Sequence, residues 1–216
     1  MQIYSSVVNF FQDGGVFMYP IVIVFAFGAA IAVERWIYLT RATISSKSLW
    51  KQITPYIKAR KFDEAVGIAS KSKAAVATVL SYGLKRSAIA RRRDDIEKAM
   101  EESLMEVMPR LEKRTHYLAT FANMATLLGL LGTIIGLINA FTAVSGANPA
   151  EKADLLSASI SVAMNTTAFG LMVAIPLLLV HTLLQTKTTE LEDSLEMATV
   201  KFLNTVFESR TDGQAA

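Results

Sequence analysis

Uncharged hydrogen-bonding side chains occur inside two of the most apolar stretches of the chain. Thr133 lies in the middle of LLGLLGTIIGLINAF, residues 127–141. A later apolar stretch carries four more such groups, Ser161, Asn165, Thr166 and Thr167. Polar groups in hydrocarbon need hydrogen-bonding partners. These side chains therefore either join helices by hydrogen bonds or line a polar path on which hydroxyls and water carry an ion, and the residues leave both interpretations open.

Glycines accompany these polar groups at helical spacing. If residues 125–140 form a helix, Ala125, Gly129, Thr133, Gly136 and Ala140 follow one another at steps of three and four and share one small face. Small side chains let transmembrane helices approach closely. Such packing matters in lipid, where the hydrophobic effect does not drive helices together. We therefore expect helix packing at the glycines of both stretches, Gly129, Gly132, Gly136 and Gly170.

The apolar stretches carry no Asp, Glu, Lys, Arg or His. Proton relays through membranes usually use an intramembrane Asp, Glu or His. Here His116 and His181 lie only near the expected ends of the second and third apolar runs. If the polar groups do conduct protons, the titrating group must come from another subunit.

The elements that position these residues are three long uncharged runs. Residues 14–33, 117–150 and 155–180 contain no Asp, Glu, Lys, Arg or His. A bilayer core needs about 20 helical residues, so each run is long enough to span it. The chain has 216 residues, is 52% hydrophobic and has no cysteine. This pattern predicts an all-α membrane protein with three transmembrane helices and long cytoplasmic helical extensions.

Charge sets the expected orientation. Seventeen Lys and Arg residues lie between Arg41 and Arg114, whereas residues 145–154 contain only Lys152. The positive-inside rule then places the amino terminus in the periplasm and the carboxyl terminus in the cytoplasm. Membrane orientation explains the excess of Lys and Arg over Asp and Glu. Even Arg91-Arg92-Arg93 therefore needs no nucleic-acid partner. The expected segments are an interfacial segment (1–15), span one (16–39), a cytoplasmic helical domain (40–116), span two (117–144), a periplasmic loop (145–153), span three (154–184) and a cytoplasmic C-terminal helix and tail (185–216).

Three local predictions concern the cytoplasmic parts. Residues 56–70 combine an apolar stripe with a charged face, which predicts one helix, and residues 71–87 predict its hairpin partner. A long helix from Asp94 is expected to pass Pro109 and run directly into span two. The chain turns polar at Gln185, and residues 188–207 predict a cytoplasmic amphipathic helix.

Two motifs resemble the signature halves of the MotA/TolQ/ExbB proton-channel family. They are LLGLLGTIIGLINAF (127–141) and NTTAFGLMVAIP (165–176). The length and three spans are most similar to the ExbB/TolQ branch. The resemblance implies a homopentamer in the bacterial inner membrane around a dimer of a single-span ExbD/TolR-type partner, whose aspartate carries the proton. It further implies that the work passes to a TonB-like protein for outer-membrane import or, alternatively, to a Tol-type envelope system. By motif position, Thr133 and Thr167 match the two family threonines that face that aspartate.

The sequence departs from the family pattern at two positions. Val162 stands where many relatives have a glutamate, and Thr126 stands where relatives often have a proline. The first departure leaves open whether the ion is H⁺ or Na⁺, since hydroxyls and Asn165 could coordinate either. We expect no enzyme chemistry, no cofactor and no metal site. A non-conducting scaffold stays an alternative, whereas a small-solute transporter would predict inverted repeats, which are not visible.

Overall fold

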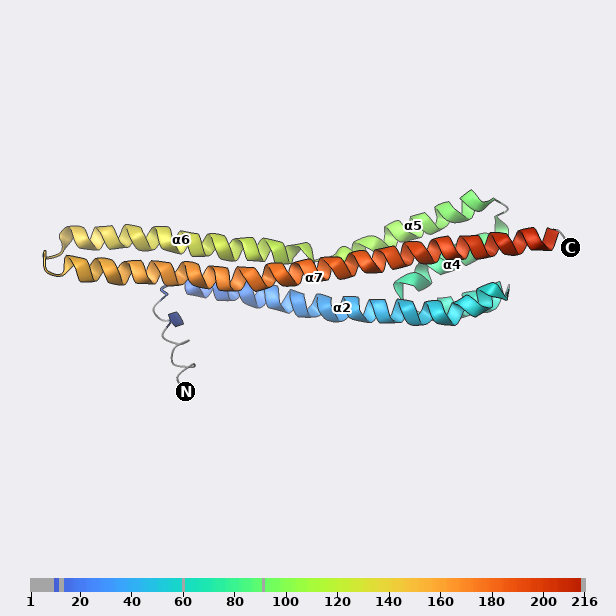
Figure 1. The fold of residues 1–216 in the computed structure, drawn as a ribbon, viewed down its shortest axis with the longest axis horizontal. Helices are drawn as coiled ribbons and strands as arrows, with labels where there is room; N and C mark the ends of the chain where they lie inside the picture. The colour runs from blue at the N-terminus through green and yellow to red at the C-terminus, as the bar shows by residue number, and fades with distance from the viewer. Residues whose placement is uncertain (1–9, 12–13, 60, 91, 215–216) are drawn as a thin grey trace, which may run out of the picture. The chain divides into compact units, whose positions relative to one another are not determined.

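The computed structural model describes residues 10–11, 14–59, 61–90 and 92–214, with side chains as far as residue 207. These parts of the chain form helices and contain no strand, which confirms the all-α prediction for them. Figure 1 shows the helices. Their bounds are α2 Met18–Lys58, α3 Phe62–Ser70, α4 Ala75–Ile89, α5 Arg93–Glu112, α6 His116–Gly146 and α7 Lys152–Gln214. Most of the predicted interfacial segment lies outside the described residues.

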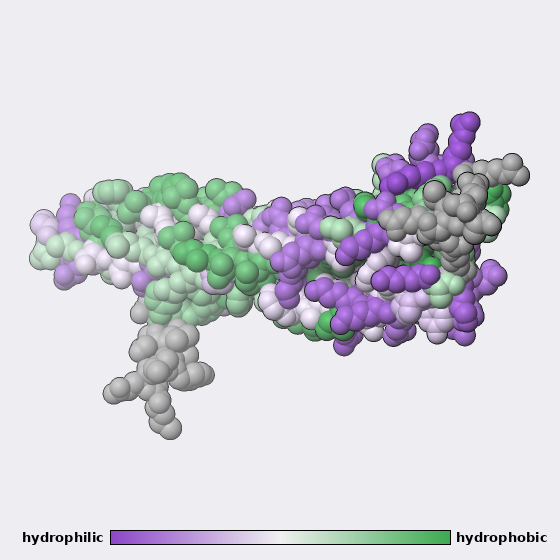
Figure 2. Space-filling model, turned by 45° about the vertical axis from the view of Figure 1, so that its right-hand side comes forward, coloured by the Kyte–Doolittle hydropathy of each residue, from purple (hydrophilic) through white to green (hydrophobic). Residues whose placement is uncertain are grey.

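Three stretches of the described chain are long and apolar enough to cross a membrane. They lie within Met18–Lys58, Arg93–Gly146 and Lys152–Phe207, in agreement with the three predicted spans. Hydrophobic side chains cover much of the surface over α6 and the first half of α7, whereas hydrophilic ones gather over the part of the molecule that holds α5 and the later halves of α2 and α7 (Figure 2). Apolar surface of this extent suits a lipid environment, in which such side chains need no burial within the protein. The chain is a multi-pass membrane protein.

The chain divides into two compact units. The first unit comprises Met1–Glu34 and Arg114–Leu183, and the second comprises Arg35–Lys113 and Leu184–Ala216. In the first unit, the start of α2 packs with α6 and α7 around a small buried cluster of Ile21, Val24, Ala122, Ala125, Val173, Ala174 and Leu177. Gly28 of α2 allows this approach, because a Cβ there would lie 2.8 Å from the Leu177 side chain.

The second unit has a larger core, built from α3, α4, α5 and the remaining parts of α2 and α7. Its fully buried side chains include Ile53, Leu80, Ile96, Met100, Leu111 and Phe202. The single helix predicted over residues 56–70 is wrong, because α2 continues to Lys58 and α3 begins only at Phe62. The turn between them is closed by a backbone hydrogen bond of 2.9 Å from Lys61 to Tyr56. Asp63 and Glu64 in the first turn of α3 favour a helix start there.

The predicted uninterrupted helix into span two is also wrong. Pro109 lies inside α5 and does not end it. The helix ends at Glu112, and Arg114 has φ +66°, a left-handed conformation that cannot continue a right-handed helix. Both nitrogen–oxygen distances from Arg114 Nη1 to the Glu34 carboxylate are short, at 3.1 and 3.0 Å. This ion pair holds the turn against α2 in the first unit.

The helix predicted over 188–207 is confirmed as part of α7, which shows no interruption where the chain turns polar at Gln185. Its buried positions continue at helical spacing through Leu184, Leu191, Leu195 and Phe202. Pro176 lies inside the same helix. A continuous apolar face, rather than the overall composition, therefore determines how far this helix extends.

Candidate functional site

The hydroxyl groups of Thr133 and Thr167 meet between α6 and α7 of the first unit. Thr133 Oγ1 forms a hydrogen bond with Thr167 Oγ1, although the residues are 34 positions apart. Both hydroxyls also lie near the carbonyl oxygen of Gly129, at 2.9 Å from Thr167 Oγ1 and 3.2 Å from Thr133 Oγ1. Thr133 Oγ1 lies 3.4 Å from the carbonyl oxygen of Ala163 as well. The sequence-predicted pair thus forms a compact polar cluster, which we call the threonine pair.

Glycines on both helices make this meeting possible. A Cβ on Gly129 would lie 3.3 Å from the Cα atoms of Gly170 and Thr167. A Cβ on Gly170 would lie 2.7 Å from the carbonyl oxygen of Ala125, a distance that Cβ atoms do not adopt. At Gly136 the corresponding distance to the Ala163 Cβ is 2.8 Å. The two backbones therefore approach so closely that short threonine side chains reach across the gap.

Thr166 has a different environment from its neighbour Thr167. It is 2% exposed, and its hydroxyl lies 2.6 Å from the carbonyl oxygen of Gly14 and 2.9 Å from that of Val162. Its methyl group fills the space over Gly132, where a Cβ would approach it to 2.4 Å. Thr166 thus connects α7 to α6 and to the turn that precedes α2. Residue type placed both threonines on the predicted ion path, and only the resemblance to the family motif distinguished Thr167 from Thr166.

The remaining predicted polar residues lie further out on α7. Ser161 is exposed and Asn165 is half-buried. Within the described part of the chain, neither forms a hydrogen bond to the threonine pair. Val162, at the position of the family glutamate, is exposed on the same helix. These three positions therefore lie outside the threonine pair.

An aromatic cluster beside the site was missed by the sequence analysis. The ring centroid of Phe169 lies 6.4 Å from that of Phe10 and 6.1 Å from that of Phe11, both at steep angles typical of edge-to-face contacts. The ring centroids of Phe11 and Tyr19 lie 5.3 Å apart. Gly15, with φ +73°, turns the chain between these rings and α2. The Phe-Phe pair followed by two glycines was the only available signal for this packing.

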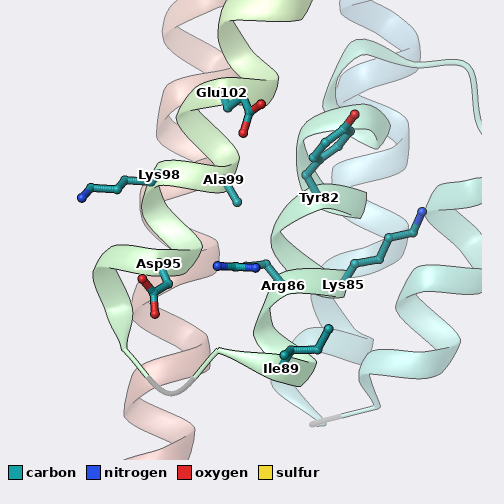
Figure 3. Close-up of a pocket in the computed structure, with 8 residues that line it drawn as sticks. All are labelled: Tyr82, Lys85, Arg86, Ile89, Asp95, Lys98, Ala99 and Glu102. Atoms are coloured by element: carbon teal, nitrogen blue, oxygen red, sulfur yellow. The ribbon is translucent and has the colours of Figure 1, made fainter.

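A separate cavity of about 650 Å³ lies between α4 and α5 of the second unit. Arg86 extends from α4 toward α5, whereas Lys98 points away from the gap (Figure 3). Asp95 and Glu102 line the same space. Charges of both signs share this lining, and among the residues that the structure describes no group of three His, Cys, Asp or Glu could hold a metal ion.

Comparison with known proteins decides the family. A sequence model of the MotA/TolQ/ExbB proton channel family matches residues 71–197, which is more than half of the chain. The chain belongs to this family. The matched residues include both motifs, and with them Thr133 and Thr167.

Relatives within the family carry two kinds of name. A putative biopolymer transport protein ExbB homolog of Methanothermobacter thermautotrophicus is 28% identical over 90% of this chain and 68% of its own length. The putative biopolymer transport protein ExbB-like 1 of Synechocystis is 28% identical over 81% of the chain and 68% of its own length. The Tol-Pal system protein TolQ of Haemophilus influenzae is 34% identical, but over only 44% of this chain and 41% of its own length. These relatives support a membrane channel subunit of the ExbB/TolQ type.

Proposed function

We propose that the protein is the ExbB-like subunit of an ion-driven motor in the bacterial inner membrane. In this proposal five copies surround a dimer of an ExbD/TolR-like single-span partner, and the motor energises a TonB-like protein for outer-membrane import. The amino terminus lies in the periplasm and the carboxyl terminus in the cytoplasm. The longer coverage by ExbB-named relatives supports the ExbB role over the TolQ role in envelope maintenance.

The observation that carries the proposal is the threonine pair. Its hydroxyls hydrogen-bond each other and the carbonyl of Gly129, with no Asp, Glu, Lys, Arg or His in the apolar runs. Hydroxyls cannot release a proton near neutral pH, but they can donate to or accept from a carboxylate or hydronium that comes close. A partner aspartate that protonates and deprotonates would therefore find both donors and acceptors on this face. Thr133 and Thr167 serve the ion path directly, and Ser161 and Asn165 extend it along α7.

The same contacts also fit a non-conducting scaffold in which the threonines only hold α6 against α7. Interhelical hydrogen bonds of this kind contribute about 0.6–2 kcal/mol each. The scaffold predicts that losing them weakens the subunit, whereas the motor predicts that losing them stops transport in an intact complex. The scaffold therefore predicts a change in assembly or stability, whereas the motor predicts a change in transport alone.

The test uses Thr133→Val and Thr167→Val, with Thr133→Ser and Thr167→Ser as matched controls that keep the hydroxyl. The motor predicts that the valine variants still co-purify with the single-span partner at wild-type stoichiometry but lose energised uptake. The serine variants are expected to retain most of it. Valine variants that fail to assemble, or that assemble and transport normally, would contradict the proposed role of the pair.

A further inference from the structure

A small cavity in the second unit lies where α2, α4 and α7 meet. Its volume is about 220 Å³. Its polar lining residues are Ser46, Lys47, Lys51, Ser194 and Lys201, and apolar side chains, among them Trp50 and Met197, make up the rest of its wall. Drug-sized ligands occupy pockets of about 300–1,000 Å³, so this space suits a small group rather than a whole nucleotide.

The charge of this cavity has one sign. Lys47 and Lys51 are one turn apart on α2, and Lys201 approaches from α7. No carboxylate lines the cavity, and within the described residues none of the three lysines has a carboxylate within 4.0 Å. The cavity between α4 and α5 differs, because Asp95 and Glu102 accompany its cations (Figure 3). Three uncompensated ammonium groups create a local field that favours an anion.

A buried hydroxyl lies in the wall of the same cavity. Ser46 is 3% exposed, and its Oγ has no hydrogen-bonding partner among the described residues. Other hydroxyls on α2 behave differently, because Thr43 and Thr54 donate to carbonyl oxygens one turn back at 2.9 and 2.6 Å. Buried polar groups almost always have a partner, so the unsatisfied Ser46 hydroxyl is free to donate a hydrogen bond to an anion in the cavity.

We propose that this cavity binds a phosphate group. Phosphate oxygens accept charge-assisted hydrogen bonds from lysine ammonium groups, and Lys is a common phosphate ligand as a point charge. The Ser46 hydroxyl supplies a donor inside the cavity, and the Ser194 hydroxyl lies in its wall. The phosphate belongs either to a soluble phosphorylated molecule or to an anionic lipid headgroup. This site lies in the second unit and contains none of the residues that the motor proposal uses.

Trp50 provides a built-in reporter of binding. The chain has two tryptophans, so a Trp36→Phe background leaves the indole in the cavity wall as the single fluorophore. The full chain, reconstituted in nanodiscs of zwitterionic lipid, is titrated with inorganic phosphate and with pyrophosphate. The reference is sodium chloride at matched ionic strength. The site predicts a saturable change in Trp50 emission with the phosphates and none with chloride.

Variants test which residues hold the anion. Removing the three cations by Lys47→Gln, Lys51→Gln and Lys201→Gln is expected to weaken binding more than tenfold. Ser46→Ala is expected to weaken it several-fold with an unchanged helical circular dichroism spectrum. The control triple variant Lys58→Gln, Lys71→Gln and Lys73→Gln removes the same charge from exposed positions elsewhere in the second unit. No saturable response in the background protein, or an equal loss in both triple variants, would overturn the proposal.

A second set of nanodiscs distinguishes the source of the phosphate. These discs contain phosphatidylglycerol, and the pyrophosphate titration is repeated in them. If a lipid headgroup is the occupant, it competes, and the apparent affinity for pyrophosphate falls in the background protein but not in the Lys47, Lys51 and Lys201 variant. An affinity unchanged by lipid composition assigns the site to a soluble phosphate compound.

Discussion

At the scale of single residues, two adjacent threonines have different roles. Thr167 joins the threonine pair on the α6 side, while Thr166 is turned toward Gly14 and Gly132. Side chains one position apart on a helix differ by about 100° in direction, so one polar dipeptide can serve two neighbours. In our proposal Thr167 serves the ion path, and Thr166 positions α7 relative to the turn before α2.

Substitution of Thr166 separates its hydrogen bond from its packing. Thr166→Val keeps the methyl group over Gly132 but removes the donor to Gly14, which is expected to cost about 1–3 kcal/mol. Thr166→Ser keeps the donor and loses the methyl group, at about 1 kcal/mol. Thermal unfolding of the protein in detergent measures both. A valine variant as stable as the parent would show that the Gly14 contact contributes nothing.

Glu192 is the second residue with an unusual environment. Its Oε1 atom is buried without a partner among the described residues. Burial is the main cause that raises the pKa of Glu192 above 4.5, and the neighbouring carboxylates of Glu112, Asp193 and Glu196 raise it further. The folded state therefore binds the proton more tightly than the unfolded chain does. Stability falls as the pH rises through the pKa of the folded state, because the ionised form is then buried among like charges.

Glu192→Gln is therefore expected to stabilise the protein at neutral and higher pH. The gain should shrink as the pH is lowered through the raised pKa of Glu192, because the parent carboxyl then becomes protonated in the folded protein. Thermal unfolding from acidic to alkaline pH measures the difference, with the exposed substitution Glu190→Gln on the same helix as control. A glutamine variant that is less stable than the parent at pH 8 would mean that the carboxylate has a stabilising cation in the assembled protein.

The resemblance to the family motifs singled out Thr133 and Thr167 but gave no information on their surroundings. Thr133 and Thr167 could be recognised because each lies in a specific motif. The contact of Thr166 with Gly14 joins residues 152 positions apart and depends on how a glycine turn folds back. The spacing of residues in the sequence cannot predict such a contact, because the contact depends on the tertiary path of the chain.

At the scale of elements, close contact between α6 and α7 depends on glycine more than on hydrogen bonds. Gly170 lies against both Ala125 and Gly129, with no space for a side chain. The hydroxyl contacts of the threonine pair exist only while these backbones stay close. Adding even one methyl group at Gly170 is therefore expected to separate the two helices and to disturb the threonine pair.

Gly170→Ala is expected to destabilise the subunit by about 1–3 kcal/mol, because the added methyl group meets backbone atoms that cannot move aside locally. Gly67→Ala is the matched control, since nothing lies within 4 Å of a Cβ there. In helix α3 that control should be neutral or stabilising by up to about 1 kcal/mol. Equal unfolding temperatures for the two variants would contradict close packing at Gly170.

The helices show where sequence patterns predict boundaries well and where they do not. Uncharged runs predicted the three spans because lipid demands apolar side chains over a fixed length. The break at residues 113–115 was missed because Arg114 adopts a left-handed conformation, which arginine rarely does. The continuity of α7 past Gln185 was missed because average composition changes there while the buried face does not.

At the scale of the whole molecule, one chain presents a polar site without a group that titrates in the membrane. Family membership and the threonine pair are both established for the single subunit, whereas conduction in our proposal belongs to an assembly. The missing carboxylate must then come from the partner. The identity of the ion also depends on that assembly, because hydroxyls accept contacts from H⁺ carriers and from Na⁺ alike.

The central claim is tested most directly by ion flux in liposomes that contain this protein and the proposed ExbD/TolR-like single-span partner. Flux is measured under a pH gradient and, separately, under a Na⁺ gradient, for the parent, Thr167→Val and Thr167→Ser. The account predicts flux of one ion that requires the partner, is lost in the valine variant and is largely kept in the serine variant. A stable complex with the partner that passes neither ion under either gradient would contradict it.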